Sequence, residues 1–169
     1  MSLKGTILDA TALIDFDFHW LDEWAWLEEN YSPLYIAQEV LDSDRLELPT
    51  RQTARRVFTL LIHDSEEVYA SYLEFASQAP LLSTADRATI ALARHQLLLC
   101  ASDDGLVVET CQLYGIAYTR TLRLLSEMVK RQHKTVEKVI EIAETLIEDR
   151  GKRITSQVLE DWKESLQQL

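Results

Sequence analysis

The chain has 169 residues, of which 47% are hydrophobic and 27% charged, and it contains only four glycines, three prolines and two cysteines. This length and composition are typical of a folded domain with a core of its own, and they exclude disordered, collagen-like and disulfide-stabilised proteins. The 28 acidic and 17 basic residues give a net charge of −11, which excludes nonspecific, charge-driven binding along nucleic acids or anionic membranes.

Strands and helices are predicted to alternate from the start of the chain. Residues 5–9 form a short apolar run that ends in an acid, which predicts a buried strand leading into a helix over residues 10–14. A second strand is predicted over residues 34–37, followed by a helix over residues 38–44. Residues 57–62 fit either a strand or the end of a helix, because the apolar period alone does not decide between them.

Two capped helices are predicted next. Ser65 is the expected N-cap of the first, whose apolar side chains at helical spacing are Val68, Tyr69, Tyr72, Leu73 and Ala76. The segment from Ser83 to Asp86 has the cap chemistry of a second helix. Residues 97–101 then form a continuous apolar run, which is typical of a strand in a parallel sheet covered on both faces.

The remaining elements complete an α/β pattern. A helix is predicted from Gly105 to about Gly115, and residues 116–118 form the last predicted strand. Alternating strands and helices indicate right-handed crossovers and a parallel α/β sheet of four to five strands flanked by helices, with its core over residues 5–120. Residues 121–169 carry three apolar stripes at helical spacing, so we expect C-terminal helices packed on the same domain.

Cysteine usage and hydropathy indicate the compartment. Cys100 and Cys111 lie in apolar surroundings and match no metal-binding spacing, so they are predicted to be buried, reduced thiols. No stretch reaches the roughly 18 apolar residues of a membrane span, and the N-terminus shows no secretory signal pattern. We therefore expect a cytoplasmic protein that does not bind a membrane.

Acidic residues follow the predicted strands of the sheet. Asp9 ends the first strand, Asp103 and Asp104 follow the strand over residues 97–101, and Asp86 lies in the first turn of the preceding helix. The carboxyl ends of parallel strands are where functional groups gather. Crowded carboxylates repel one another unless a divalent cation neutralises them, and Mg²⁺ or Mn²⁺ prefers such oxygen ligands. Each acid taken alone fits the role of a helix cap equally well.

Three segments, in chain order, resemble the motifs of PIN domains. Residues 7–14 resemble the opening motif, a hydrophobic residue followed by Asp-x-Ser/Thr-x-Leu-Ile, and residues 82–93 resemble the helix that carries the third acid. Residues 102–104, with Gly115 and Ile116 downstream, resemble the closing segment, Thr-Asp-Asp followed by Leu-Gly-Ile. The joint order of these short motifs makes the resemblance more specific than any one of them.

The resemblance extends to a prokaryotic group. Residues 21–24 and 119–125 are similar to PIN-like proteins related to the VapC toxins of toxin–antitoxin pairs. This implies a metal-dependent endoribonuclease, the toxin of such a pair, that hydrolyses RNA phosphodiesters with a metal-activated water and leaves 5′-phosphate and 3′-hydroxyl ends. It also implies RNA as substrate, an antitoxin protein as partner and a homodimer.

The resemblance also implies which residues form the site. Asp9, Asp86 and Asp104 match the catalytic acids that bind Mg²⁺ or Mn²⁺, and Asp103 lies beside them as a further metal ligand. A metal-dependent phosphatase that uses the same acids on small phosphate esters is an alternative.

The second acid of the family departs from the pattern. It normally ends the motif Pro-x-x-Val-x-x-Glu, and here residues 37–43 place Ser43 at the Glu position. We expect Asp42 to serve as this catalytic acid and metal ligand, with Asp44 and Glu39 as alternatives. If none of them reaches the metal, the alternative function is a catalytically degenerate PIN-like interaction or regulatory module.

Charged residues are distributed unevenly along the chain. Residues 1–47 carry 2 basic and 11 acidic residues, whereas residues 119–169 carry 10 basic and 9 acidic residues. Arg120 and Arg123 are candidates to bind RNA phosphates, and the arginines within residues 51–56 form a second basic patch; the alternative is a solvated helix face with i, i+4 ion pairs.

Tryptophans gather near the N-terminus. Trp20, Trp24 and Trp26 are expected in the core or in an interface rather than in a base-stacking platform. The tryptophan region and the C-terminal helices are the surfaces that we expect to supply a dimer interface.

Overall fold

The computed structural model describes residues 2–19 and 23–169. The chain divides into two compact units, Met1–Thr119 and Arg120–Leu169. The first unit contains every strand of the described chain, and the second is helical.

A five-stranded parallel sheet forms the centre of the first unit, as predicted. Its strands are β1 (Thr6–Leu8), β2 (Leu34–Ala37), β3 (Thr59–Leu61), β4 (Leu99–Ala101) and β5 (Tyr118–Thr119). Their order across the sheet is β3-β2-β1-β4-β5, and each neighbouring pair runs parallel. The carboxyl ends of all five strands therefore meet at one edge of the sheet.

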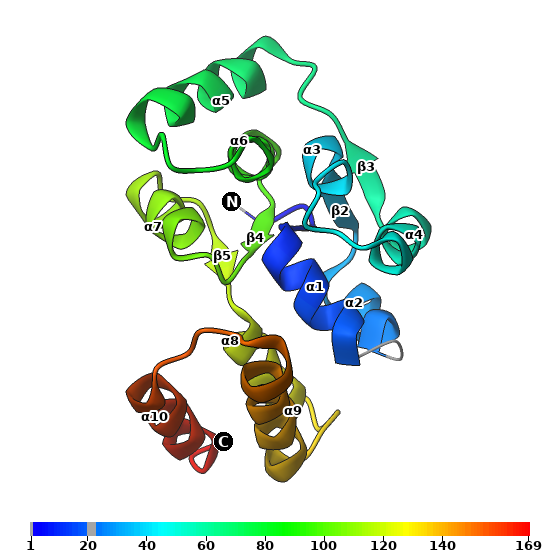
Figure 1. Ribbon diagram of the computed structural model, residues 1–169, viewed down its shortest axis with the longest axis vertical. Coiled ribbons are helices and arrows are strands. Elements are labelled where there is room, and N and C mark those ends of the chain that lie inside the picture. The colour runs from blue at the N-terminus through cyan, green and yellow to red at the C-terminus, as the bar shows by residue number, and fades with distance from the viewer. Residues whose placement is uncertain (1, 20–22) are drawn as a thin grey trace. The chain divides into compact units, whose positions relative to one another are not determined.

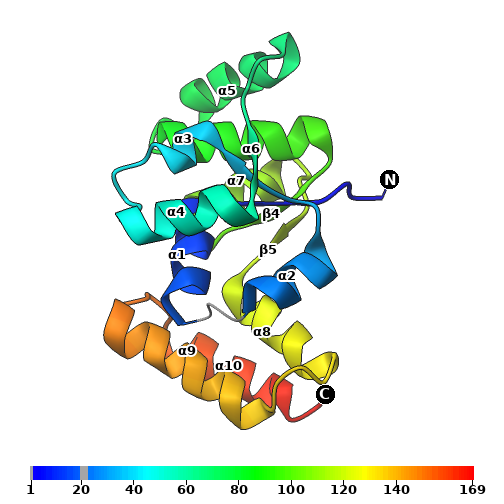
Figure 2. The same cartoon turned by 90° about the vertical axis from the view of Figure 1, so that its right-hand side faces the viewer.

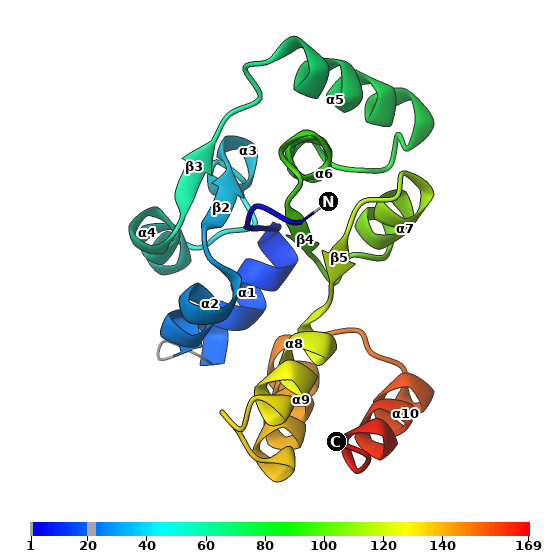
Figure 3. The ribbon, with the colours of Figure 1, turned by 180° about the vertical axis from the view of Figure 1, so that it is seen from behind.

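Helices cover both faces of this sheet. They are α1 (Ala10–His19), α2 (Glu23–Tyr31), α3 (Gln38–Leu41), α4 (Leu48–Val57), α5 (Glu66–Gln78), α6 (Thr84–Gln96) and α7 (Gly105–Leu113). In Figure 1, α1, α2 and α4 lie on one side of the sheet and α6 and α7 on the other; Figure 3 shows the same layers from behind. Helix α6 packs on β1, β2 and β4, and α5 packs on the outside of α6. The predicted α/β class is confirmed.

Several element boundaries differ from the prediction. Residues 57–62, predicted to be either a strand or the end of a helix, contain both, because α4 ends at Val57 and β3 begins at Thr59. Helix α4 itself was not predicted, since its buried residues, Thr53 and Ala54, are not strongly apolar. The strand predicted over residues 97–101 begins only at Leu99, because Leu97 ends α6 in a left-handed conformation with φ of 57°.

Three more boundaries are corrected. The helix predicted over residues 38–44 ends at Leu41, where Asp42 is the C-cap. The helix predicted over residues 10–14 continues to His19, and the last strand lies at Tyr118–Thr119 rather than over residues 116–118. These strands are only two or three residues long, so a hydrophobic run does not locate their ends.

The capping predictions are confirmed. The Ser65 side chain accepts a hydrogen bond from Val68 N at the start of α5. At the start of α6, Ser83 and Asp86 form a reciprocal capping box, in which each side chain accepts a hydrogen bond from the backbone N–H of the other residue.

The predicted inner face of α5 is partly wrong. Tyr69 and Leu73 are 50% and 49% exposed, whereas Val68, Ser71 and Phe75 are buried. The apolar residues of α5 are spread too widely around the helix for all of them to face α6, so part of the set remains on the surface.

The other buried residues agree with the expectations. Trp24 and Trp26 are both 4% exposed and belong to the core, whereas Trp20 lies outside the described residues. Cys100 and Cys111 are buried and unbridged. Their mutual hydrogen bond, together with burial, raises the pKa of Cys100 well above its ordinary value.

Gly5 enters β1 with φ of 149°, a conformation that other residues rarely adopt. A Cβ at this position would lie 2.5 Å from the carbonyl oxygen of Pro33. We expect Gly5→Ala to destabilise the protein by about 2–4 kcal/mol, because it adds both backbone strain and a backbone clash. Thermal unfolding measures the effect, with Gly105→Ala as the control, since a Cβ at Gly105 meets nothing within 4 Å. An unchanged melting temperature for Gly5→Ala would contradict this description of the entry to β1.

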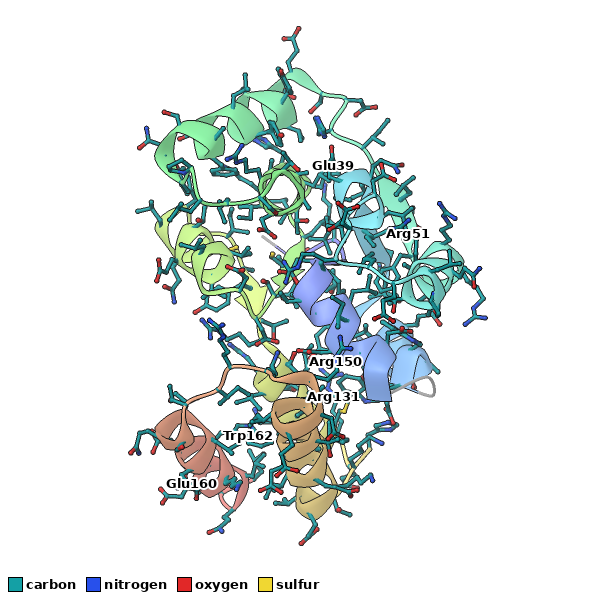
Figure 4. All side chains as sticks on the ribbon, viewed as in Figure 1. Glu39, Arg51, Arg131, Arg150, Glu160 and Trp162 are labelled. Atoms are coloured by element: carbon teal, nitrogen blue, oxygen red, sulfur yellow. The ribbon has the colours of Figure 1, made fainter. Side chains whose placement is uncertain are left out.

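The second unit contains α8 (Thr121–Lys130), α9 (Val136–Arg150) and α10 (Ser156–Leu166). Trp162 connects α10 to α8: its indole N–H lies 3.1 Å from the carbonyl oxygen of Leu122 and 2.9 Å from Ser126 Oγ, and the side chain is buried (Figure 4). Thr135 and Thr155 cap α9 and α10. Among the described helices of the chain, none is long and apolar enough to cross a membrane.

Candidate functional site: the carboxylates at the edge of the sheet

Asp9 directly follows β1, and α1 begins at the next residue. Its side chain is fully buried. Since β1 is the central strand of the sheet, the chain places this carboxyl group in the middle of the carboxyl edge.

Two hydroxyl groups and one backbone N–H hold the Asp9 carboxyl group. Thr11 Oγ1 and Ala12 N donate hydrogen bonds to Asp9 Oδ1, at 2.7 and 2.9 Å. Ser102 Oγ donates to the other oxygen, Oδ2. Because Ser102 follows β4, this bond joins the ends of two neighbouring strands.

The same hydroxyl groups also position the two aspartates that follow Ser102. Thr11 Oγ1 accepts a hydrogen bond from Asp103 N at 3.1 Å, and Ser102 Oγ accepts one from Asp104 N at 3.1 Å. Each hydroxyl therefore connects one oxygen of Asp9 to the backbone of one aspartate. We call Thr11 and Ser102 the hydroxyl clamp.

The surroundings of Asp9 raise its pKa to about 7 from the ordinary value of 3.8. Burial is the largest cause, because it disfavours the charged form. The hydrogen bonds from Ala12, Ser102 and Thr11 lower the pKa but do not compensate for burial, and the negative charge of Asp86 raises it further. A cation at this position would reverse this balance, because it would stabilise the carboxylate form.

Asp86 is the acid that the structure brings close to Asp9. It lies in the first turn of α6 and is 6% exposed. Its Oδ2 accepts hydrogen bonds from Ser83 N at 3.2 Å and Ser83 Oγ at 2.7 Å. These bonds fix the side chain while its charge acts on Asp9. Asp86 is thus both a helix-capping residue and the charged neighbour of Asp9.

Asp104 and Asp103 lie at the start of α7. Asp104 is the N-cap, and its Oδ1 accepts hydrogen bonds from Leu106 N at 2.9 Å and Val107 N at 3.4 Å. Both aspartates are partly exposed, unlike Asp9. The backbone of both is tied to Asp9 through the hydroxyl clamp.

A family model described as a PIN domain matches residues 5–168. The chain belongs to the PIN domain family. PIN domains are in general nucleases, and in general use divalent metals. No curated protein and no solved structure matches the chain.

Asp42 and Asp44, in the segment around the position of the family's second acid, are exposed, whereas Asp9 and Asp86 are buried. Asp42 is exposed, and both of its oxygens lie 2.9 Å from Gln38 Nε2. Asp44 is also exposed. The structure does not gather Asp42 with Asp9 and Asp86 into a group of three donors among the described residues, and its role as the second acid stays a prediction.

Glu39 and Ser43, also in this segment, have other partners. Glu39 Oε1 lies 2.5 Å from Nδ1 of His63, which follows β3. The carbonyl oxygen of Ser43, at the position of the family's Glu, accepts a hydrogen bond from Arg51 Nη2 at 3.0 Å. Figure 4 shows Glu39 on α3 and Arg51 on α4. A guanidinium group thus holds the backbone where the family has a carboxylate.

The donor chemistry of the site fits Mg²⁺ or Mn²⁺. Asp9 and Asp86 supply carboxylate oxygens, and the hydrogen bonds given above for Asp86 and Asp104 use only one oxygen of each side chain. Within residues 2–19 and 23–169, no three His, Cys, Asp or Glu side chains lie close enough together to hold a metal. Mg²⁺ keeps several waters and is commonly bound by one or two carboxylates together with substrate phosphates, a number of carboxylates that Asp9 and Asp86 match.

Sequence reasoning did not assign a role to the hydroxyl clamp. The available signals were the positions of two hydroxyl residues, Thr11 two residues after Asp9 and Ser102 directly before Asp103. Only the structure shows that both hydroxyls contact the same carboxyl group.

The basic residues of α8 and α9 differ in whether they form ion pairs. Arg120, the N-cap of α8, and Arg123 are both exposed. By contrast, Lys130 pairs with Glu127 at 3.0 Å and Lys138 pairs with Glu141 at 2.9 Å; both pairs have i, i+3 rather than i, i+4 spacing and lie on a solvated helix face. Arg120 and Arg123 therefore remain the candidates for phosphate contacts.

Proposed function

We propose that the protein is a PIN-type endoribonuclease that depends on Mg²⁺ or Mn²⁺. The observation that carries the proposal is the buried Asp9, whose pKa is raised to about 7 beside a second carboxylate, Asp86, at the carboxyl edge of the sheet. An uncompensated buried acid of this kind is costly to keep charged unless a cation is bound next to it.

In this proposal, the chain's own residues hold and orient the site. Asp9 and Asp86 bind the metal ion, and the hydroxyl clamp holds the backbone of Asp104, at the start of α7, to the same strand end. A bound metal ion lowers the pKa of a coordinated water and stabilises the charge that develops on the attacked phosphodiester. The hydroxyl clamp keeps the Asp9 oxygens in a fixed orientation and ties both following aspartates to the same strand end.

RNA binding needs cationic contacts, because the chain as a whole is acidic. We assign the phosphate contacts to Arg120 and Arg123, which are exposed and follow β5 in the chain. RNA would thus be held at a few local contacts rather than by the total charge of the protein.

We assign a biological role on the basis of the resemblance of residues 119–125 to the VapC group: the nuclease is the toxin of a toxin–antitoxin pair. The antitoxin would be a protein with a basic segment that neutralises the carboxylates around Asp9. A small neighbouring reading frame encoding such a protein would support this role.

A second candidate function has a specific observation in its favour. Ser43 replaces the second acid, and the described residues hold no cluster of three metal donors. A PIN domain with this composition could instead act as an interaction or regulatory module without nuclease activity. The same experiment distinguishes the two functions.

The test is cleavage of single-stranded and structured RNA in Mn²⁺ or Mg²⁺. We expect cleavage with 5′-phosphate ends, its loss in EDTA, and a reduction of at least about a hundredfold in Asp86→Asn, because that variant removes a metal-binding charge while the capping bonds to Ser83 can still form. Glu109→Gln, an exposed change on α7, is the control. No cleavage by the native protein would favour the module without activity, and cleavage that survives both Asp9→Asn and Asp86→Asn would place the site elsewhere.

A further inference from the structure

Strand β3 has an open side. It is an outermost strand of the sheet and pairs with β2 on its other side. Leu60 in the middle of the strand and Ile62 just after it are 42% and 54% exposed. Figure 2 faces this side of the molecule, where α4 leads into β3 and the chain continues to α5. An exposed edge strand with apolar side chains is a template for pairing with another strand.

The charges at the two ends of β3 have opposite signs. Arg55 and Arg56, in the last turn of α4, precede the strand and are exposed. Asp64, Glu66 and Glu67 follow it and are exposed as well. Within the described residues, no ion pair involves either arginine.

The acidic end is not neutralised by nearby basic residues of the chain. Residues 57–86 contain no lysine or arginine; of their five acids, Asp64, Glu66 and Glu67 lie after β3, whereas Glu74 pairs with Arg94 at 3.1 Å and Asp86 belongs to the carboxylate site. The edge therefore runs from a basic end, across apolar side chains, to an acidic end.

Such an edge is complementary to itself when it is reversed. In an antiparallel pair related by a two-fold axis, the start of one strand lies opposite the end of the other, and every contact occurs twice. The arginines before β3 would then face the acids after β3 of the second copy, and Leu60 would lie near the axis. We propose that two copies of the chain dimerise through β3, forming a continuous ten-stranded sheet across the two-fold axis.

Helix dipoles explain only part of the pattern. Basic residues in the last turn of α4 and acidic residues in the first turn of α5 stabilise those helices in a monomer as well. They do not account for the exposed Leu60 and Ile62 between the charges. Pairing of the two copies brings these apolar side chains together and places each charged group near an opposite charge.

The surface differs from the tryptophan region, which was expected to supply an interface. Trp24 and Trp26 are each 4% exposed, so their side chains are occupied in the core of a single copy. The open edge at β3 has both the exposed apolar area and the complementary charge that those residues lack.

Light scattering after size-exclusion chromatography tests the proposal. We expect the native protein at micromolar concentration to have twice the mass of one chain. Two charge-reversal variants, Arg55→Glu/Arg56→Glu and Glu66→Arg/Glu67→Arg, should each raise the dimer dissociation constant at least about tenfold and migrate as monomers, because each brings like charges together twice.

Mixing the two variants supplies the decisive control. In a heterodimer the acidic α4 end of one variant faces the basic α5 end of the other, and the second contact is equally complementary, so the mixture should recover the dimer mass. This recovery also shows that both variants are folded. A native protein that stays monomeric, a dimer unaffected by either reversal, or a mixture that stays monomeric would overturn the proposal.

An engineered thiol checks the register independently. Because Cys100 and Cys111 are both fully buried, Leu60→Cys introduces a single accessible thiol. A short bismaleimide should join two copies of this variant into a covalent dimer. It should leave Leu113→Cys monomeric, although Leu113, on α7, is 78% exposed. Equal cross-linking of both variants, or none at Leu60→Cys, would contradict a dimer centred on β3.

Discussion

Replacing Asp9 by Asn will abolish RNA cleavage and, in EDTA at about pH 8, raise the melting temperature of the protein by about 5–10 °C. The Asn side chain has the same shape, and its oxygen can accept the bonds from Thr11 and Ala12. It carries no charge, so it avoids the cost of keeping a buried carboxylate ionised without a metal. It also loses the charge that the proposed metal needs.

The pH dependence follows from the direction of the pKa shift. Asp9 titrates at about 7 in the folded protein and near the ordinary 3.8 when unfolded. Between these values the folded state binds one proton more than the unfolded state, so the protonated Asp9 contributes stability below about pH 4 that is lost as the pH rises to about 7. At about 1.4 kcal/mol per pH unit, the loss is about 4 kcal/mol in the absence of metal.

Thermal unfolding in EDTA between about pH 5 and 8 measures this effect. The native protein should lose stability across that interval, and Asp9→Asn should show a flatter profile. Asp149→Asn, at an exposed carboxylate of α9, is the control and should follow the native profile. If Asp9→Asn lowered the melting temperature at both pH values, the carboxylate of Asp9 would be a stabilising group, contrary to its burial.

The second large effect concerns the hydroxyl clamp. We expect Ser102→Ala and Thr11→Val each to reduce cleavage by about 10–100-fold, as the loss of groups that orient metal-binding residues commonly does. Each hydroxyl also lowers the pKa of Asp9, so its removal raises that pKa further and moves the acid limb of the pH–rate profile to higher pH. Expressed as free energy, the loss of activity in the double variant should be smaller than the sum of the losses in the two single variants, because both hydroxyls act on one carboxyl group.

The pH–rate profile separates this role from a general loss of structure. Thr110→Val is a matched control, since Thr110 is a buried hydroxyl that donates to the carbonyl oxygen of Leu106 away from Asp9. It should leave both the rate and the profile unchanged. If a clamp variant cleaved RNA more slowly but the acid side of its pH–rate profile did not shift, the hydroxyls would not act through Asp9.

Much of the fold follows from local sequence patterns. The alternation of apolar runs and helices predicts the parallel sheet, and Ser65 and Ser83 predict the starts of α5 and α6, because capping depends on residues close together in the chain. Helix α4 was missed because its polar residues and lone Ala54 carry no apolar stripe, and its place is determined by contacts with α1.

The candidate site, like the fold, follows only in part from the sequence. That Asp9 and Asp86 lie together follows from their positions at the end of a strand of the parallel sheet and in the first turn of the helix that precedes β4. The clamp does not follow from any local pattern, because Ser102 and Asp9 are 93 residues apart in the chain. The end of α3 also differs from the prediction: the helix expected over residues 38–44 ends at Leu41, so Asp42 is its C-cap.

Calorimetric titration of the protein with Mn²⁺ at about pH 6, repeated in buffers of different ionisation enthalpy, tests the metal site most directly. Since Asp9 has a pKa of about 7, it is largely protonated at this pH, and metal binding must displace its proton. We expect binding with release of about one proton per ion, loss of proton release in Asp9→Asn, and weaker binding in Asp86→Asn. No binding at millimolar Mn²⁺, or binding without proton release, would contradict a metal site built on Asp9.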